Sequence, residues 1–218
     1  MKLISHRGLN NHEYKENSKE AIISSLNEDY IAGVEIDIRL TKDKKLALYH
    51  DKLINIGIDK EKYVKNLTLS ELKTYTNNTV CELNELLIEL NTNKEILIEI
   101  KYEDTNYKEI VDIVYETIKN YLNLNIKICS FNKDVISYFK KKYKNYQVGL
   151  IIGIKKNKYR FFNFYNFNSI SILHHKLLKN NDYVWTIDDI NTFNILKNKR
   201  KNIAIITNKA YLFKDIND

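Results

Sequence analysis

The sequence of 218 residues is poor in several residue types: it has no proline, two cysteines, five glycines and one tryptophan. Two cysteines are too few for a disulfide framework, and neither Cys81 nor Cys129 lies in a Cys-x-x-Cys pair. The chain also lacks an N-terminal stretch typical of a signal peptide, and any run of about 18 apolar residues that could span a bilayer. We therefore expect a cytoplasmic protein that folds in a reducing compartment.

No segment divides the chain into parts. There is no linker rich in Gly and Ser, no block of one charge and no repeat of about 20 to 50 residues. Apolar residues make up 44% of the chain and charged residues 29%, which is typical of a globular protein rather than a disordered one. The length is sufficient for a full hydrophobic core. We expect one domain over residues 1–218.

Positive charge exceeds negative charge in this sequence. Lys and Arg number 35 and Asp and Glu 28, so the net charge at pH 7 is +7. Such an excess favours anionic partners, among them phosphates, nucleic acid and an acidic membrane surface. The absence of proline, together with abundant Lys, Asn and Ile, indicates an A+T-rich coding sequence, which inflates the number of basic residues. We therefore expect no nucleic-acid partner, and no oligomeric state follows from the sequence.

Short β-rich runs alternate with helical patterns along the chain. Nine runs predict strands: Lys2–Ser5, Gly33–Ile38, Leu46–Tyr49, Glu95–Ile100, Ile126–Cys129, Gln147–Ile152, Ser169–Leu173, Tyr183–Thr186 and Asn202–Ile206. Five patterns between them predict helices: Ser18–Asn27, Glu82–Asn91, Tyr107–Leu122, Lys133–Lys142 and Asp189–Lys197. Ser18 and Asp189 are suitable N-cap residues for the first and last of these helices.

The order of these elements predicts an α/β fold, a (β/α)8 TIM barrel. Only Arg39 to Lys45 separates the second and third predicted strands, which is too short for a parallel crossover, so these two strands should form an antiparallel hairpin. Removing the hairpin arm leaves eight alternating strand–helix units, as the barrel requires. A doubly wound open sheet is the alternative, but its usual Gly-rich phosphate loop after the first strand is absent.

Two acidic residues occupy the second predicted strand. Glu35 and Asp37 are two positions apart, so their side chains share one face of the strand, while Val34, Ile36 and Ile38 are apolar. Two carboxylates on one face of a buried strand are costly unless a cation lies between them. A hard divalent ion with oxygen ligands would serve, and an ion pair to Arg or Lys is the alternative.

Other polar residues also follow predicted strands. His6 and Arg7 come after the first strand, and Glu99 and Lys101 repeat the two-residue spacing on the fourth. His50 closes the hairpin arm, which folds back toward the end of the second strand. In barrels of this kind the carboxyl ends of the strands build the active site. The clustering of these residues at one rim favours a metal site over scattered surface charge.

Short motifs in this order resemble those of the glycerophosphodiester phosphodiesterases of bacterial type. The first half of the chain contributes five of them: His6-Arg7-Gly8, Glu16-Asn17-Ser18, Gly33-Val34-Glu35-Ile36-Asp37, Thr41-Lys42-Asp43 and His50-Asp51. The second half continues with less specific ones: Glu99-Ile100-Lys101, Ser130-Phe131, Val184-Trp185-Thr186 and Ile205-Ile206-Thr207. The resemblance covers nearly the whole chain.

The resemblance implies a TIM barrel that hydrolyses a phosphodiester with a divalent metal ion, Mg²⁺ or Ca²⁺. It assigns the metal to Glu35, Asp37 and Glu99, acid and base catalysis to His6 and His50, and the substrate to Arg7, Lys101 and Trp185. Arg7 and Lys101 would hold the phosphate, and Trp185 would stack on the glycerol. Glu16, Ser130 and Phe131 match further motif positions beside these groups, with Glu16 also a candidate ligand.

These residue types suit the chemistry. A transition state for phosphodiester cleavage gathers charge on the phosphoryl oxygens, which a metal, Arg7 and Lys101 would stabilise. Two histidines that titrate near neutral pH suit removal of one proton and delivery of another. We expect hydrolysis of a small-molecule glycerophosphodiester to an alcohol and glycerol 3-phosphate. Attack by water or by a neighbouring glycerol hydroxyl, and either assignment of acid and base, remain open.

Two alternatives share the fold or the residues. Hydrolysis of a lipid phosphodiester, as by a lysophospholipase D or phospholipase D, would use the same groups. A basic, aromatic segment, Lys155 to Tyr165, would then provide peripheral lipid contact. A module that binds glycerol phosphate without turnover is disfavoured by the intact acidic and histidine residues. His12 and the pair His174-His175 are expected to have no catalytic role.

The sequence also departs from the family pattern. Lys15 and Lys44 replace a proline and a turn glycine, and Thr207-Asn208-Lys209-Ala210 replaces Thr-Asp-x-Pro. After Asp51 the usual Arg-Thr-Thr segment is absent, which leaves the identity of the substrate open. The lobe that the family inserts before Glu99 should be small here, over about Lys52 to Val80.

Overall fold

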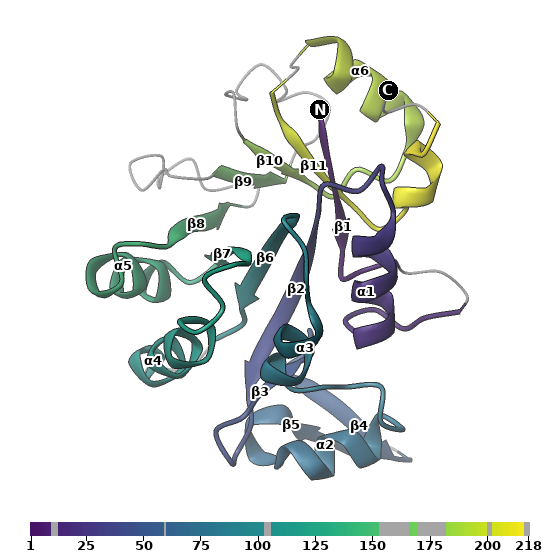
Figure 1. The fold of residues 1–218 in the computed structure, drawn as a ribbon. Coiled ribbons are helices and arrows are strands. Elements are labelled where there is room, and N and C mark those ends of the chain that lie inside the picture. The colour runs from purple at the N-terminus through teal and green to yellow at the C-terminus, as the bar shows by residue number, and fades with distance from the viewer. Residues whose placement is uncertain are drawn as a thin grey trace.

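The computed structural model describes residues 1–9, 13–58, 60–102, 106–152, 166–169, 182–199 and 202–215 of the chain. Within these residues it has an α/β fold, with a parallel sheet that curls on itself and helices on the outside (Figure 1). In this part of the chain no helix combines the length and the apolar character that crossing a membrane requires.

Eight parallel strands pair in a closed ring. They are β1 (Lys2–His6), β2 (Gly33–Leu40), β6 (Glu95–Ile100), β7 (Asn125–Ser130), β8 (Gln147–Ile152), β9 (Asn166–Ser169), β10 (Tyr183–Trp185) and β11 (Ala204–Thr207). Each strand pairs with the next in this order, and β11 pairs back onto β1. Because all eight strands run in one direction, their carboxyl ends lie at the same end of the ring.

Helices alternate with these strands and pack outside them. They are α1 (Lys19–Asn27), α3 (Leu83–Glu89), α4 (Tyr107–Ile118), α5 (Lys133–Lys142) and α6 (Ile190–Lys199), followed by the short 3-10 helix η4 (Ala210–Phe213). Ser18 caps α1 by accepting a hydrogen bond from the backbone of Ala21, and Asp189 accepts one from Thr192 at the start of α6. Both caps were predicted from the sequence.

Two element boundaries differ from the sequence prediction by three residues or more, and the other described ones by two residues at most. Helix α4 ends at Ile118 rather than Leu122, because the chain must turn to bring Asn125 beside Glu95 in the sheet, and Leu122 is 85% exposed. Strand β9 begins at Asn166, three residues before the predicted start at Ser169. The start of β9 was not predicted because the strand contains two asparagines, and Asn is depleted in strands. Residues 170–173, Lys155 to Tyr165, His12 and His174-His175 lie outside the described residues.

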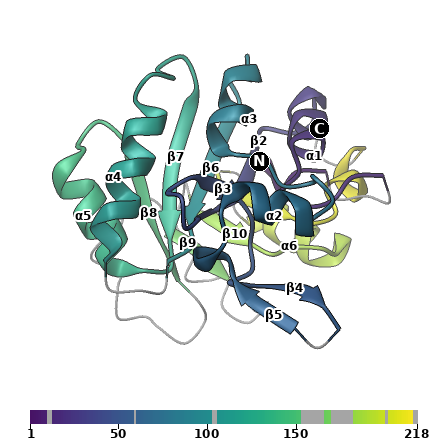
Figure 2. The ribbon, with the colours of Figure 1, turned by 90° about the horizontal axis from the view of Figure 1, so that it is seen from below.

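The segment after β2 forms a small lobe. Strand β3 (Leu46–Leu48) pairs antiparallel with β2, and Ile38 lies opposite Leu48. The chain then forms a hairpin of β4 (Leu53–Gly57) and β5 (Lys60–Tyr63), the 3-10 helix η1 (Val64–Asn66) and helix α2 (Leu69–Tyr75). Figure 2 shows this hairpin standing out from the rest of the fold. The sequence pattern did not predict β4, β5 or α2.

Successive side chains of a strand point to opposite faces of the sheet, and this alternation separates two apolar layers. Ile36 and Ile98 belong to the larger cluster, packed with residues of the covering helices. Leu97 and Cys129 belong to a smaller cluster built mostly from residues of the ring strands. The second set faces the ring interior, as expected from the two-residue period of a strand. The side chain of Glu99 therefore also faces inward.

The amino-terminal end of the ring interior is closed by a buried polar cluster. Lys127 Nζ lies 3.0 Å from Glu95 Oε1 and donates a hydrogen bond of 2.7 Å to the hydroxyl of Tyr183. Lys2 also pairs with Glu95. These groups form ion pairs and hydrogen bonds with one another. The pocket that could take a ligand lies at the opposite, carboxyl end of the ring.

Candidate active site

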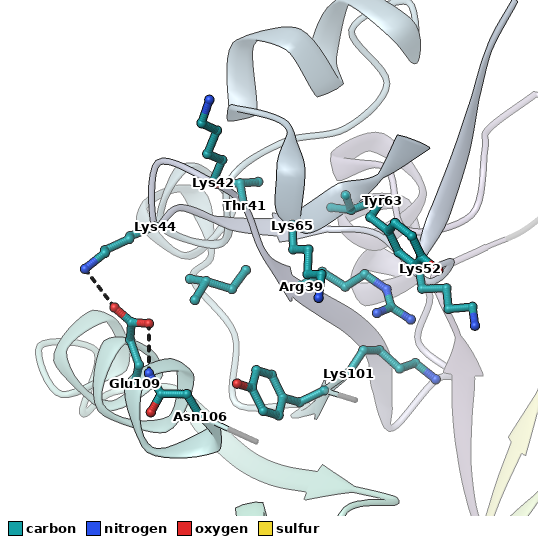
Figure 3. A pocket seen from close by; sticks show the side chains of 13 residues that line it. Arg39, Thr41, Lys42, Lys44, Lys52, Tyr63, Lys65, Lys101, Asn106 and Glu109 are labelled. Carbon is teal, nitrogen blue, oxygen red and sulfur yellow. Dashed lines mark hydrogen bonds and ion pairs between the residues drawn. The ribbon is translucent and has the colours of Figure 1, made fainter. Parts of the chain in front are cut away.

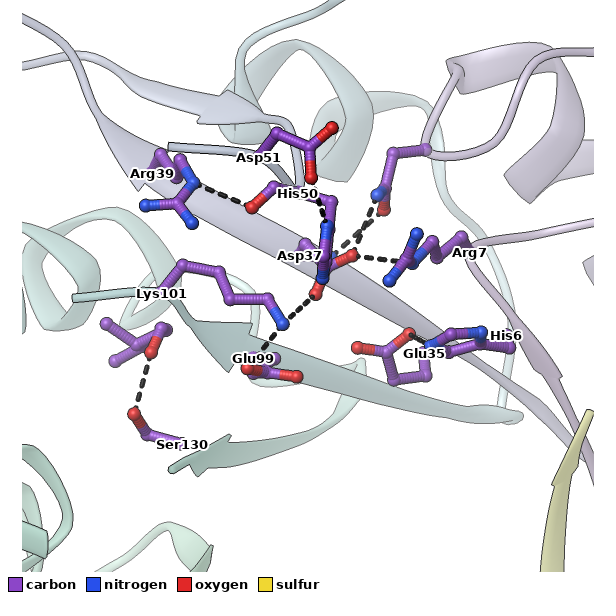
Figure 4. Close-up of polar contacts among 12 residues, drawn as sticks. His6, Arg7, Glu35, Asp37, Arg39, His50, Asp51, Glu99, Lys101 and Ser130 are labelled. Carbon is purple, nitrogen blue, oxygen red and sulfur yellow. Dashed lines mark hydrogen bonds and ion pairs between the residues drawn. The ribbon is translucent and has the colours of Figure 1, made fainter. Parts of the chain in front are cut away.

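Three carboxylates meet at the carboxyl end of two neighbouring strands. Asp37 on β2 lies opposite Glu99 on β6, and Glu35 precedes Asp37 by two residues on the same face. One carboxylate oxygen of each residue lies within 4.8 Å of the others, and all three residues are buried (Figure 4). This is the proximity that the spacing of the sequence predicts.

Glu35 is the member of this trio with the fewest partners. It is 4% exposed, and neither of its carboxylate oxygens accepts a hydrogen bond from a described residue. Burial, and then the charges of Asp37 and Glu99, hold the pKa of Glu35 well above its usual value. A buried carboxylate that accepts no hydrogen bond from a described residue and lies beside two others is a strong site for a cation.

Asp37, in contrast, is surrounded by donors. Arg7 Nε lies 2.9 Å from Asp37 Oδ2, and Asn17 Nδ2 donates a hydrogen bond of 2.9 Å to the same oxygen. Asn17 also accepts a hydrogen bond of 3.0 Å from the backbone N–H of Asp37. Burial alone would raise the pKa of Asp37, but Lys101, Arg7 and Asn17 outweigh it and lower the pKa. Asp37 is therefore ionised at neutral pH.

The backbone before this site is held in an unusual conformation. Arg7 and Asn17 have φ values of 61° and 57°, in the left-handed region. Gly8, at φ 86°, lies so close to helix α1 that a Cβ there would be 2.6 Å from the carbonyl carbon of Ala21. Hydrogen bonds from Arg7 N to the carbonyl of Glu35 and from Asn17 N to that of Arg7 fix the segment. This backbone conformation directs the side chains of Arg7 and Asn17 toward Asp37.

Lys101 bridges two of the carboxylates. Its Nζ lies 3.1 Å from Asp37 Oδ1 and 2.7 Å from Glu99 Oε1. Burial opposes the charge of Lys101, but Glu99 and Asp37 dominate and raise its pKa. Burial raises the pKa of Glu99 to about 7, although Lys101 opposes the shift. Glu99 therefore titrates near neutral pH.

The ring of His6 is oriented by a chain of hydrogen bonds. His6 Nδ1 lies 2.6 Å from Asn208 Oδ1, and Asn208 Nδ2 donates a hydrogen bond of 2.8 Å to Asp188 Oδ2. Since the amide oxygen accepts, Nδ1 carries the proton and Nε2 is left as an acceptor. His6 Nε2 lies 3.6 Å from Glu35 Oε2. Burial is the main cause that lowers the pKa of His6, which favours the neutral ring.

His50 approaches the site from the end of the hairpin arm. Its Nδ1 lies 2.7 Å from Asp51 Oδ1, and its carbonyl accepts a hydrogen bond of 2.8 Å from Arg39 Nε. The backbone N–H of Tyr49 donates to the carbonyl of Asp37, which brings the arm back to the carboxylates. The return of His50 to the level of Asp37 follows from the antiparallel pairing of β2 and β3.

These groups line one pocket of about 220 Å³. Its walls include His6, Arg7, Glu35, His50, Glu99, Lys101, Phe131 and Trp185. The rings of Phe131 and Trp185 meet edge to face at 5.4 Å, and Lys101 Nζ lies 5.6 Å from the centre of Phe131. One side of the pocket is therefore aromatic and the other side charged.

Two predicted residues lie at the site without joining the carboxylates. Glu16 Oε1 pairs with Arg7 Nη1 at 2.8 Å, and its side chain is 45% exposed. It holds Arg7 from outside and lies apart from the buried trio. Ser130 Oγ donates a hydrogen bond of 2.7 Å to the carbonyl of Ile100 and accepts one from Asn132 N. Its hydroxyl is therefore committed to the backbone at the end of β6.

Sequence reasoning missed four residues that hold the site together: Asn17, Arg39, Asp188 and Asn208. Asn17 was noted only as part of a motif, and Asn208 only as a departure from the family pattern. A signal existed for Arg39, which continues the two-residue spacing of Glu35 and Asp37 on β2. Asp188 had no such signal, because its partner Asn208 is distant in sequence.

The fold and the site together define a class of protein. It is an α/β-barrel enzyme whose pocket combines buried carboxylates, imidazoles and cationic side chains, a set suited to an anionic ester. Comparison with known proteins makes the assignment specific. The model of the Glycerophosphoryl diester phosphodiesterase family matches residues 6–210, so the chain belongs to this family of phosphodiester hydrolases.

Relatives and a solved structure agree with this assignment. A glycerophosphodiester phosphodiesterase of Bacillus altitudinis is 30% identical over 153 residues, which are 64% of this chain and 62% of that protein. One from Caldanaerobacter subterraneus is 28% identical over 211 residues, 85% of each chain. A phosphodiesterase of Oleispira antarctica, solved with the product sn-glycerol-3-phosphate, shares the fold with a TM-score of 0.81 at 17% identity, covering 99% of this chain and 96% of that one.

Proposed function

We propose that this chain hydrolyses glycerophosphodiesters to an alcohol and glycerol 3-phosphate, with acid and base catalysis by histidine. The observation that carries the proposal is that Glu35 and Glu99 line one small pocket with two imidazoles, Arg7 and Lys101, and that Asp37 completes a buried carboxylate trio with these two residues. The relatives named as glycerophosphodiester phosphodiesterases support the same reaction. So does the product held by the Oleispira antarctica phosphodiesterase.

We propose that Glu35, Asp37 and Glu99 hold a divalent metal ion, Mg²⁺ or Ca²⁺. The donor set fits a hard cation, because the three carboxylates supply oxygens and those of Glu35 have no hydrogen-bond donor among the described residues. When bound, such an ion would supply Lewis-acid stabilisation of charge on the phosphoryl oxygens.

The two histidines are proposed to move protons on opposite sides of phosphorus. His6 is kept neutral by burial, and its Nδ1–H is held by Asn208, so its Nε2 can accept a proton from the attacking hydroxyl. His50, with Asp51 beside its Nδ1, would deliver a proton to the leaving alkoxide. Both water and a neighbouring glycerol hydroxyl are compatible with this arrangement as the attacking group.

Arg7 and Lys101 are proposed to hold the phosphate. Both are cations at the carboxylates with side chains only 15% and 12% exposed, so little water screens their charges. Trp185 and Phe131 would bind the carbon face of the glycerol on the other side of the pocket. In this proposal the phosphorus would lie between the two histidines.

The site variants Glu35→Gln, Asp37→Asn and His50→Ala test the reaction. Each should reduce release of glycerol 3-phosphate from glycerophosphocholine to near background, while circular dichroism shows a folded protein. Glu116→Gln on the outside of α4 is the matched control and should retain full turnover, because its side chain is 60% exposed. Retention of activity in all three site variants contradicts the proposal.

We also propose that residues 1–218 act as one domain in the cytoplasm, with a small insertion over about residues 52–80. The family match over residues 6–210 and the packing of Ile54, Val64 and Leu72 onto Ala47 support a single unit. A cytoplasmic location is consistent with the two cysteines, Cys81 and Cys129, which are both free.

A further inference from the structure

A carboxylate lies behind the amide that contacts His6. Asp188 belongs to the segment between β10 and α6, and Asn208 follows directly after β11. The backbone N–H of Ile187 donates a hydrogen bond of 3.1 Å to the carbonyl of Ile206, which fastens the segment after β10 to the neighbouring strand. Neither Asp188 nor Asn208 lines the catalytic pocket, so both act on the site from behind His6.

Both oxygens of Asp188 accept hydrogen bonds. Oδ1 accepts from the hydroxyl of Thr207 at 2.9 Å and from the backbone N–H of Asn208 at 2.8 Å. Oδ2 accepts from Asn208 Nδ2 at 2.8 Å. Thr207 is fully buried, and its hydroxyl also accepts a hydrogen bond of 3.0 Å from the backbone N–H of Lys209. These contacts hold the carboxylate in one orientation at the end of β11.

The carboxylate determines which way the amide of Asn208 faces. A carboxylate accepts hydrogen bonds and donates none, so it selects the NH2 end of the amide. The amide oxygen then points at His6, where Asn208 Oδ1 lies 2.6 Å from Nδ1. A reversed amide would bring its oxygen against Asp188 Oδ2, which places two acceptors together without a proton between them. Asp188 therefore disfavours the reversed amide.

The orientation of this amide decides which nitrogen of His6 carries the proton. Because an amide oxygen accepts, a neutral ring beside it carries its proton on Nδ1 and keeps a lone pair on Nε2. Figure 4 shows the ring beside Glu35, where His6 Nε2 lies 3.6 Å from Glu35 Oε2. Nε2 is the atom proposed to take the proton from the attacking hydroxyl. A ring with its proton on Nε2 has no lone pair there and could not take it.

We propose that Asp188 is a positioning residue that selects the Nδ1–H tautomer of His6 through the amide of Asn208. This inference rests on the proposed role of His6 as the base, and it adds the residue that prepares that base for the reaction. The same tautomer would result if the two side chains changed places. A carboxylate at position 208 would accept from His6 Nδ1–H and from the NH2 group of an asparagine at position 188.

The single change Asp188→Asn should reverse the tautomer. The atom at the place of Oδ1 must remain an oxygen, because the backbone N–H of Asn208 and the hydroxyl of Thr207 donate to it. The new NH2 group therefore faces the NH2 group of Asn208, and the amide of Asn208 must turn over. Its own NH2 group then meets His6 Nδ1, which must accept, so the proton moves to Nε2.

Exchange of the two side chains separates this role from simple packing. A well-placed general base contributes about 10²–10⁴-fold, so kcat of Asp188→Asn on glycerophosphocholine should fall about 10- to 100-fold with little change in KM. Asn208→Asp should lose at least as much, because it brings two carboxylates together. The double variant Asp188→Asn/Asn208→Asp should recover most of the lost kcat. Asp29→Asn, a change of the same kind at an exposed residue before β2, should keep the kcat of the wild type.

Nitrogen NMR of the His6 ring gives a readout that does not depend on turnover. At about pH 8, above the ordinary pKa of imidazole, the wild type and the double variant should carry the proton on Nδ1, and Asp188→Asn on Nε2. His6→Gln identifies the signals of this ring among those of the five histidines. If Asp188→Asn does not fold, Thr207→Val replaces it. This variant removes a donor to Asp188 Oδ1 and should show the same changes to a smaller extent.

The role of Asp188 is overturned by wild-type kcat in Asp188→Asn, by a double variant no more active than Asp188→Asn, or by a loss of kcat as large in Asp29→Asn. An unchanged tautomer in Asp188→Asn overturns it as well, and turnover by the wild type then still supports hydrolysis. If the wild type shows no turnover, while the tautomer reverses in Asp188→Asn and returns in the double variant, hydrolysis is contradicted and the role of Asp188 stands.

Discussion

Replacement of Glu35 by Gln should stabilise the metal-free protein and abolish its response to metal. The carboxylate is 4% exposed and neither oxygen accepts a hydrogen bond from a described residue. A buried unsatisfied polar group costs about 1–3 kcal/mol, and a charged one costs more. Gln remains polar at this position but removes the charge, and with it the additional cost. At about pH 8 with chelator, the free energy of unfolding of Glu35→Gln should therefore exceed that of the wild type by about 1–3 kcal/mol.

The sign of the pH dependence follows from the pKa of Glu35, which the folded state raises. Between the usual value and the raised value the folded protein binds more protons than the unfolded chain, so its stability falls as pH rises. The advantage of Glu35→Gln should therefore be small near pH 4.5, the usual pKa, and grow as pH increases. Urea unfolding at several pH values measures this difference.

With bound metal the wild type should become more stable than Glu35→Gln. At a concentration of about 100 times its dissociation constant, a ligand that binds only the folded state adds about 2.7 kcal/mol. Mg²⁺ or Ca²⁺ should add this to the wild type and little to Glu35→Gln, while Glu116→Gln behaves as wild type. Equal metal stabilisation of wild type and Glu35→Gln, or lower stability of Glu35→Gln at every pH, contradicts a buried charge and a metal ligand at Glu35.

Two further predictions concern residues that the sequence analysis missed. Asn17→Ala should lower the free energy of unfolding by about 2 kcal/mol, because it removes two buried hydrogen bonds to Asp37; an unchanged urea midpoint contradicts this role. Asn208→Ala should reduce kcat about tenfold with little change in KM. Asn208 contacts His6 and is itself held by Asp188, so it orients the His6 ring and does not bind substrate. Partial rescue by Asn208→Gln would support positioning, whereas a change confined to KM contradicts it.

The arrangement of the carboxylates could be predicted because it depends on local geometry. Alternation along a strand places Glu35 and Asp37 on one face, and parallel pairing places Glu99 beside Asp37. The short connection from Arg39 to Lys45 likewise requires an antiparallel arm, and β3 pairs with β2 in that way. These features need no knowledge of distant contacts.

The small lobe and the supporting asparagines could not be predicted in the same way. All four residues of β5 are exposed and β4 has one buried residue, so neither strand carries the apolar alternation that indicates a strand. Asn208 contacts His6 across 202 positions of sequence. The cavity that Arg39, Lys52 and Lys101 line (Figure 3) could not be predicted either, because these residues come together only through the closure of the barrel and the fold of the lobe.

We propose that Glu35, Asp37 and Glu99 hold one divalent ion at which a glycerophosphodiester is cleaved. The direct measurement is the release of glycerol 3-phosphate by chelator-treated wild type during titration with Mg²⁺ and with Ca²⁺. We predict negligible turnover without metal and saturable recovery with one of these ions. Full turnover in the presence of chelator, or no turnover with either ion, contradicts the claim.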